Sequence, residues 1–125
     1  MPAAASRVAG VLQAAEEGDL SRVRRPIQAG RVGVDQADER GWTALMASAE
    51  TGQLRVCRWL VSKGGANVEV KTNDGFTPLH LAAQNSQLAV VRFLVTEARA
   101  DVQAKENRGA TPLHIAAQEG QLAVV

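Results

Sequence analysis

Between residues 88 and 97, apolar side chains recur every three or four positions, which is the spacing of one face of an α-helix. The residues that form this face are Leu88, Val91, Leu94 and Val95. A shorter apolar stretch over residues 79–84 predicts another helix, and Asn85 with Ser86 separates the two. This part of the chain therefore predicts a pair of helices joined by a tight turn.

The shorter helix is preceded by Thr77 and Pro78. Threonine is a good N-cap, and proline fits the first helical turn. After the longer helix, residues 98–108 are predicted to form an extended return loop that ends at Gly109. A glycine there supplies the positive φ that other residues resist. The predicted unit is a turn, a short helix, a longer helix and a return loop.

Three similar heptapeptides mark the start of successive copies of this unit, and they recur at a fixed interval. They begin at Gly41, Gly75 and Gly109, which are 34 positions apart. A second series keeps the same step between the paired helices and comprises Gly18, Gly52, Ser86 and Gly120. Self-similarity at a period of this size indicates stacked repeats, each of which buries its apolar face against its neighbours.

The period divides the chain into four units, of which the first and last are incomplete. The predicted boundaries are a capping repeat with its lead-in at 1–37, full repeats at 38–71 and 72–105, and a truncated repeat at 106–125. In the first unit, helices are predicted over residues 8–16 and 19–29. Pro26 lies about two turns into the second of these, so we expect a kink or early fraying there.

The last unit ends a few residues into its second helix, and its final residues include Leu122, Val124 and Val125. A solenoid needs a polar terminal repeat to stay soluble. We therefore expect this uncapped end to be covered by further repeats of a longer chain or by self-association.

Residues 77–83 (Thr-Pro-Leu-His-Leu-Ala-Ala) and 111–117 (Thr-Pro-Leu-His-Ile-Ala-Ala) resemble the opening-helix motif of the ankyrin repeat family. That repeat is a β-turn plus two helices of about 33 residues. The tetratricopeptide repeat has a similar length, but its tyrosine-containing pattern is not found in this chain. The resemblance covers residues 8–125 and implies an all-α ankyrin-repeat solenoid of about four units.

Three departures from the family pattern put local stability in doubt. The segment at 43–49 has neither the proline nor the histidine of the motif. Ser86 stands where the family prefers glycine, and a left-handed backbone there would cost about 1 kcal/mol more for serine. Ala98 and Arg99 replace the usual glycine after the second helix, so that loop is expected to be irregular.

Composition narrows the class of partner. The 125 residues carry a net charge of +1, which gives no bulk attraction to nucleic acid or to an anionic membrane. No apolar run approaches the roughly 18 residues of a membrane-spanning helix. Cys57 is the only cysteine, so no internal disulfide can form, which favours a reducing compartment. We expect a cytoplasmic or nuclear protein whose partner is another protein.

No catalytic constellation, phosphate-binding loop or metal-ligand cluster is found in the sequence, so no enzyme activity, cofactor or metal is expected. The resemblance instead implies a structural role for the two histidines. In the family the motif threonine bonds the motif histidine and ties the turn to the next repeat. The pairs here are Thr77 with His80 and Thr111 with His114. Cys57 is expected to be buried and inert.

The resemblance also implies a partner-binding surface, formed by the turn tips and by the inner face of the first helices. Carried over position by position, it comprises Glu39, Arg40, Trp42, Glu50, Thr51, Asn73, Asp74, Phe76, Gln84, Asn85, Asn107, Arg108, Ala110, Gln118 and Glu119. Exposed aromatic residues beside arginine are typical of binding hot spots. Trp42 is interpreted as a contact residue, whereas contact and internal packing both stay open for Phe76. Trp59 and Phe93 are assigned to the core.

The sequence thus predicts a protein–protein interaction module or adaptor. The alternative is the targeting or regulatory arm of a larger enzyme or channel whose other domains lie beyond residue 125. A separate basic cluster consists of Arg22, Arg24, Arg25 and Arg31. It is interpreted as a solvated face of the capping unit, with a secondary site for an acidic partner as the weaker alternative.

Overall fold

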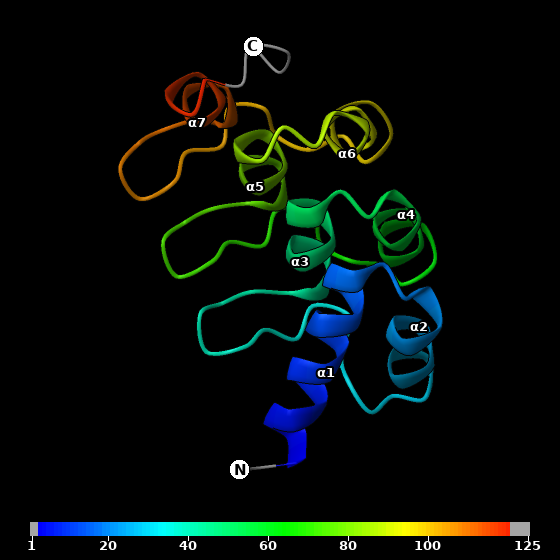
Figure 1. Ribbon diagram of the computed structural model, residues 1–125. Helices are drawn as coiled ribbons and strands as arrows, with labels where there is room; N and C mark the ends of the chain where they lie inside the picture. Colours follow the sequence, from blue (N-terminus) through cyan, green and yellow to red (C-terminus); the bar gives the residue numbers. More distant parts are fainter. Residues whose placement is uncertain (1–2, 121–125) are drawn as a thin grey trace.

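The computed structural model describes residues 3–120 and shows a stack of helix pairs linked by long loops (Figure 1). The first helices of successive units, α1, α3, α5 and α7, pack directly against one another. The loops project side by side next to them, and α2, α4 and α6 form the other side of the stack (Figure 1). No strand occurs within these residues. The predicted all-α solenoid is confirmed.

The first unit consists of α1 (Ala3–Glu17) and α2 (Leu20–Gln28). The first helix starts five residues earlier than predicted. Asp19 caps α2 by accepting a hydrogen bond from the backbone N–H of Arg22. The helix continues through Pro26 and ends two residues after it. Because proline has no N–H to donate, the last turn lacks one helical hydrogen bond.

The next two units contain α3 (Ala44–Thr51) with α4 (Leu54–Ser62), and α5 (Pro78–Gln84) with α6 (Leu88–Arg92). The last described helix is α7 (Pro112–Gln118). The predicted threonine caps are confirmed, since each accepts a hydrogen bond from the backbone N–H three residues ahead; they are Thr43, Thr77 and Thr111.

The single helix predicted over residues 88–97 is wrong in its second half. There the chain continues α6 as a π-helix, η1 (Phe93–Glu97), whose turn closes with the Ala98 N–H donating to the Phe93 carbonyl at 3.0 Å. A π turn holds one residue more than an α turn. The second half of this helix thus has a wider turn than the prediction assumed.

Two residues other than glycine have a left-handed backbone. Ser86 has φ 57° at the position where Gly18 and Gly52 have φ 80° and 78°, so the condition under which serine costs more than glycine is met. Arg99, two residues after the end of η1, has φ 56°, and the equivalent residue 34 positions earlier is Gly65 at φ 73°. The fold thus imposes the same geometry at both positions of the repeat, whichever residue stands there.

The core consists of thin layers of small and branched side chains. The first helices contribute alanines, and α4, α6 and η1 contribute larger residues such as Leu60, Val90 and Leu94. Phe93 is buried as predicted, whereas Trp59 is half-buried and packs against the core. Cys57 is fully buried, and burial raises the pKa of its thiol to about 11. The thiol is therefore protonated at neutral pH and unreactive.

None of the helices within residues 3–120 is both long and apolar enough to cross a bilayer. The apolar residues predicted to form an uncapped end, Leu122, Val124 and Val125, lie outside the described part of the chain.

Candidate functional site

The turn tips stack in register because glycine starts each heptapeptide. Gly41, Gly75 and Gly109 have φ 83°, 86° and 88°, a region that side-chain-bearing residues rarely adopt. A Cβ atom on Gly41 would lie 2.9 Å from the backbone nitrogen of Asn73, and one on Gly75 would lie 2.8 Å from that of Asn107. Glycine thus permits both the turn and the close approach of the next turn.

Backbone and side-chain hydrogen bonds join successive turns. Asn73 donates two hydrogen bonds to the preceding turn. Its backbone N–H donates to the Arg40 carbonyl at 3.0 Å, and its side-chain Nδ2 donates to the Glu39 carbonyl at 2.8 Å. Asn107 repeats the arrangement one unit later, with its Nδ2 3.0 Å from the Asn73 carbonyl oxygen. These two asparagines were predicted to contact a partner, and in the structure their side chains bond neighbouring turns.

Each turn is closed by a side-chain acceptor that the sequence analysis missed. Asp38, Thr72 and Glu106 each accept a hydrogen bond from the backbone N–H four residues ahead, at 3.0, 3.1 and 3.0 Å. These acceptors are again 34 positions apart, so the period itself was the signal that could have found them.

The carboxylates among these acceptors are held in their charged form. Burial alone would raise the pKa of Asp38, but hydrogen bonds from the Arg40 side chain and from two backbone N–H groups outweigh burial and lower it. The backbone N–H of Ala110 lowers the pKa of Glu106, and the N–H and charge of Arg108 add to the effect. Both turns are therefore held by ionised side chains at neutral pH.

His80 connects its own turn to the next one, as the resemblance implied. The Thr77 hydroxyl lies 2.8 Å from its Nδ1, and its Nε2 lies 2.9 Å from the Ala110 carbonyl oxygen. The carbonyl can only accept, so Nε2 carries the proton and Nδ1 accepts from Thr77. Burial lowers the pKa of the imidazole, although the Ala110 carbonyl and Glu106 oppose the shift.

His114 makes the same contact with its own turn, at 3.1 Å from the Thr111 hydroxyl. Its ring is exposed, and its Nε2 has no hydrogen bond to any described residue. Leu113 is 50% exposed, whereas the equivalent Leu79 is 3% exposed. The outer face of α7 is thus open where the same face of α5 is covered by the following unit.

The two turn-tip aromatic residues are both half-buried. The Arg40 guanidinium lies over the Trp42 ring at 4.8 Å from its centroid, within range of a cation–π contact. The Phe76 ring lies 5.5 Å from the ring of His80. Phe76 therefore packs against His80 while staying partly exposed, and its contact with a partner stays a prediction.

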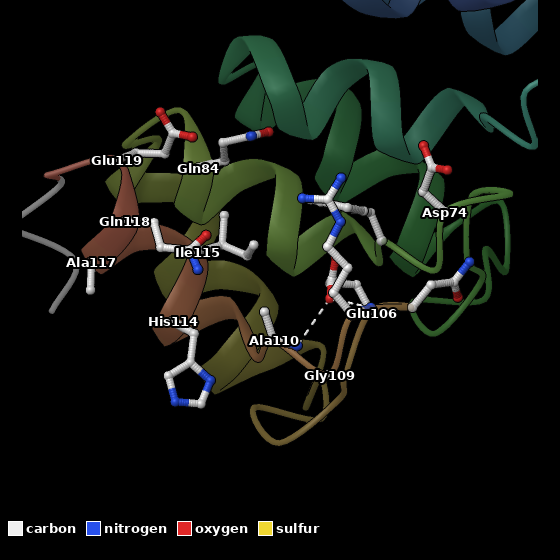
Figure 2. A pocket seen from close by; sticks show the side chains of 13 residues that line it. Asp74, Gln84, Glu106, Gly109, Ala110, His114, Ile115, Ala117, Gln118 and Glu119 are labelled. Carbon is white, nitrogen blue, oxygen red and sulfur yellow. Dashed lines mark hydrogen bonds between the residues drawn. The ribbon is translucent and has the colours of Figure 1, made fainter.

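A groove of about 750 Å³ lies between the last two turns and the helices that follow them (Figure 2). Half-buried Phe76 and buried Ile115 supply apolar lining. Polar side chains surround them, and Figure 2 shows Asp74 and Glu119 on opposite sides of the groove. The structure brings eight of the predicted contact residues together here: Asp74, Phe76, Gln84, Asn107, Arg108, Ala110, Gln118 and Glu119.

The charged side chains of this groove are available to a ligand. Within the described residues, the side chains of Asp74, Arg108 and Glu119 make no hydrogen bond or ion pair. Among the charged residues of the groove, only Glu106 has a hydrogen-bonded side chain, because its carboxylate closes the turn. Two carboxylates and one guanidinium thus face an opening with apolar residues in its lining.

The remaining predicted contact residues lie outside the groove. Thr51 donates its hydroxyl to the Glu16 carbonyl at 2.9 Å, and Asn85 donates from Nδ2 to the Leu81 carbonyl at 2.9 Å. Glu50 is half-buried; burial and the nearby Glu16 carboxylate raise the pKa of its side chain, which Arg40 partly opposes. Two of these three side chains therefore have structural roles of their own.

Two glutamines that the sequence analysis did not single out bond the unit before their own. Gln53 donates from Nε2 to the Glu16 carbonyl at 3.2 Å, and Gln87 donates to the Glu50 carbonyl at 2.9 Å. They too are 34 positions apart, so their spacing predicts the shared role.

No cluster of three or more side chains that could hold a metal occurs in the described part of the chain. A family model described as "Ankyrin repeats (3 copies)" matches residues 11–106, and one described as "Ankyrin repeat" matches residues 108–125. A search of curated proteins returned no match.

Proposed function

Because the chain belongs to the ankyrin repeat family, a family of protein-interaction modules, we propose that it is an adaptor whose protein partner docks in the groove of Figure 2. The groove itself is the observation that carries the proposal. It joins apolar lining to a rim of unpaired charges, and this is the composition of a protein–protein contact with a dry centre and a polar rim.

The stacking of the turns supports tight recognition. The groove is formed by backbone segments that are already hydrogen-bonded to one another, through Asn107 to Asp74 and through His80 to Ala110. A surface ordered before binding loses little conformational entropy when the partner arrives. The residues on the rim can then discriminate between partners by charge, with Asp74 and Glu119 favouring cationic groups and Arg108 a carboxylate.

The proposal is tested by reversing one charge on the rim. Arg108→Glu changes an exposed side chain that makes no hydrogen bond with the described residues. Because it also brings a second carboxylate near Glu106, the circular dichroism spectrum of the variant is compared with that of the wild type before binding is measured. Arg92→Glu makes the same change on α6, away from the groove, and is the matched control. Proteins captured from cell lysate by the wild type and by each variant are identified by mass spectrometry, and the best candidate is purified for affinity measurement.

We expect the dissociation constant to rise by about tenfold or more for Arg108→Glu, equivalent to about 1.4 kcal/mol, and to stay unchanged for Arg92→Glu. Equal binding by both variants would show that the partner docks elsewhere. The alternative of a recruiting arm in a larger enzyme or channel uses the same surface, and the reading frame beyond residue 125 discriminates the two.

We also propose that the protein acts in the cytoplasm or nucleus. The support is chemical, since the only thiol is fully buried and unpaired and no disulfide is needed for the fold. Imaging of the tagged chain in cells tests this, and localisation to a secretory compartment would contradict it.

A further inference from the structure

A second cavity, of about 350 Å³, lies between α1 and α2 of the first unit and shares no residue with the groove described above. Its apolar lining comes from Val11 and Pro26, together with the bare backbone at Gly10. The charged lining consists entirely of arginines: Arg7, Arg22, Arg25 and Arg31. No carboxylate lines the cavity.

Among the described residues, three of these four arginines have no side-chain partner. Arg22 is held by Glu17 at 3.2 Å and lies 3.9 Å from Asp19. Arg7, Arg25 and Arg31 make no hydrogen bond or ion pair with any residue that the structure describes, and all three are exposed. Because these guanidinium groups have no carboxylate partner among the described residues, they are free to bind an anion at the edge of the cavity.

The excess of positive over negative charge is confined to this part of the molecule. The first 31 residues hold five arginines against three acidic residues, whereas the remaining 94 carry nine basic and ten acidic residues. A long nucleic-acid backbone would extend from the cavity onto a surface with no positive excess. A short anionic ligand can instead be covered entirely by the cluster.

We infer that this cavity binds an acidic peptide segment of a partner protein, with one apolar side chain against Val11 and Pro26 and flanking carboxylates on the unpaired arginines. The planar guanidinium group matches a carboxylate with two parallel hydrogen bonds, so arginine suits this role better than lysine. The cavity volume fits one large side chain together with adjoining backbone. The site is independent of the proposed partner groove.

Selection from a random library of 12-residue phage-displayed peptides against the folded chain tests the inference. We expect one class of selected peptides to combine a Leu, Ile or Phe with at least two Asp or Glu residues. The affinity of these peptides is then measured by fluorescence polarisation for two double variants of the chain. The pocket variant is Arg25→Gln/Arg31→Gln, and the control is Arg55→Gln/Arg92→Gln, which makes an equal charge change at exposed arginines of α4 and α6.

The dissociation constant of these peptides should rise at least tenfold for the pocket variant and less than twofold for the control variant. The inference is overturned if no acidic class is selected, or if both double variants weaken binding equally. It is also overturned if a labelled 12-nucleotide single strand binds more tightly than the best peptide through the same arginines. Peptides lost on Arg108→Glu and kept on the pocket variant belong to the groove, so the two proposals can fail separately.

Discussion

The contribution of His80 to stability can be measured against that of His114, because the two side chains occupy equivalent positions in environments that differ. His80 is 0% exposed and bonds both Thr77 and the Ala110 carbonyl, whereas His114 is exposed and bonds only its own turn. The pair His80→Ala and His114→Ala therefore separates the contribution of the link to the next unit from that of the turn contact.

The magnitude follows from what each change removes. His80→Ala deletes a buried ring, leaves the Thr77 N–H without its partner and removes one of the two hydrogen bonds to the Ala110 carbonyl, which keeps the bond from the Glu106 N–H. Truncating a buried side chain of this size and leaving one polar group unpaired is expected to cost about 3–5 kcal/mol. His114→Ala removes a partly solvated hydrogen bond and should cost about 1 kcal/mol.

Chemical denaturation followed by circular dichroism at 222 nm measures both values. A native baseline with the wild-type signal must be seen for each variant, so that the free energies refer to the same folded state. If the two variants lose equal stability, or if His80→Ala loses less than about 1 kcal/mol, the argument that inter-unit bonding makes the difference is refuted.

Three further predictions follow from the geometry of single residues. The pKa of His80 is lowered from 6.5 in the folded chain, so the contribution of its neutral form to the free energy of unfolding is complete above pH 6.5 and is lost as the pH falls. The free energy of unfolding should therefore decrease between pH 7 and 5, and His80→Ala should remove that pH dependence. Arg99→Gly, and to a similar extent Ser86→Gly, should stabilise the fold by about 0.5–1 kcal/mol in urea denaturation, because both backbones are left-handed; destabilisation by either change would contradict the strain argument. The thiol of Cys57 should react with Ellman's reagent only when urea unfolds the chain, and prompt reaction of the native protein at pH 8 would contradict its burial.

The sequence predicted the repeat because the turns depend on backbone conformations that few residues adopt. Glycine at 41, 75 and 109 and threonine before the first helices are dictated by local geometry, so they recur visibly. The same reasoning marked Ser86 and Arg99 as departures from positions where the repeat has glycine, and the structure shows a left-handed backbone at both. Positions that are fixed by local backbone geometry can therefore be recognised from a single sequence.

Other features were missed because different residues perform the same task. An aspartate, a threonine and a glutamate accept the equivalent hydrogen bond at Asp38, Thr72 and Glu106, so a search for identical residues passes over them. The π turn of η1 was missed because apolar spacing of three or four does not register one wider turn. The cavity between α1 and α2 depends on side chains from two helices, which no local pattern reports.

The hydrogen bonds between units explain why a groove made of loops can be rigid. Successive units are bonded at the return loops, where Asp35 accepts from the Asn67 N–H at 2.9 Å and Glu69 accepts from the Asp101 N–H at 2.8 Å. They are bonded again at the helix ends through Gln87, and at the turn tips by the asparagines. A loop fixed at several points along its length cannot shift relative to its neighbour without breaking bonds in each place. The walls of the groove are therefore set by the stacking itself, and a partner meets a surface whose shape was determined during folding.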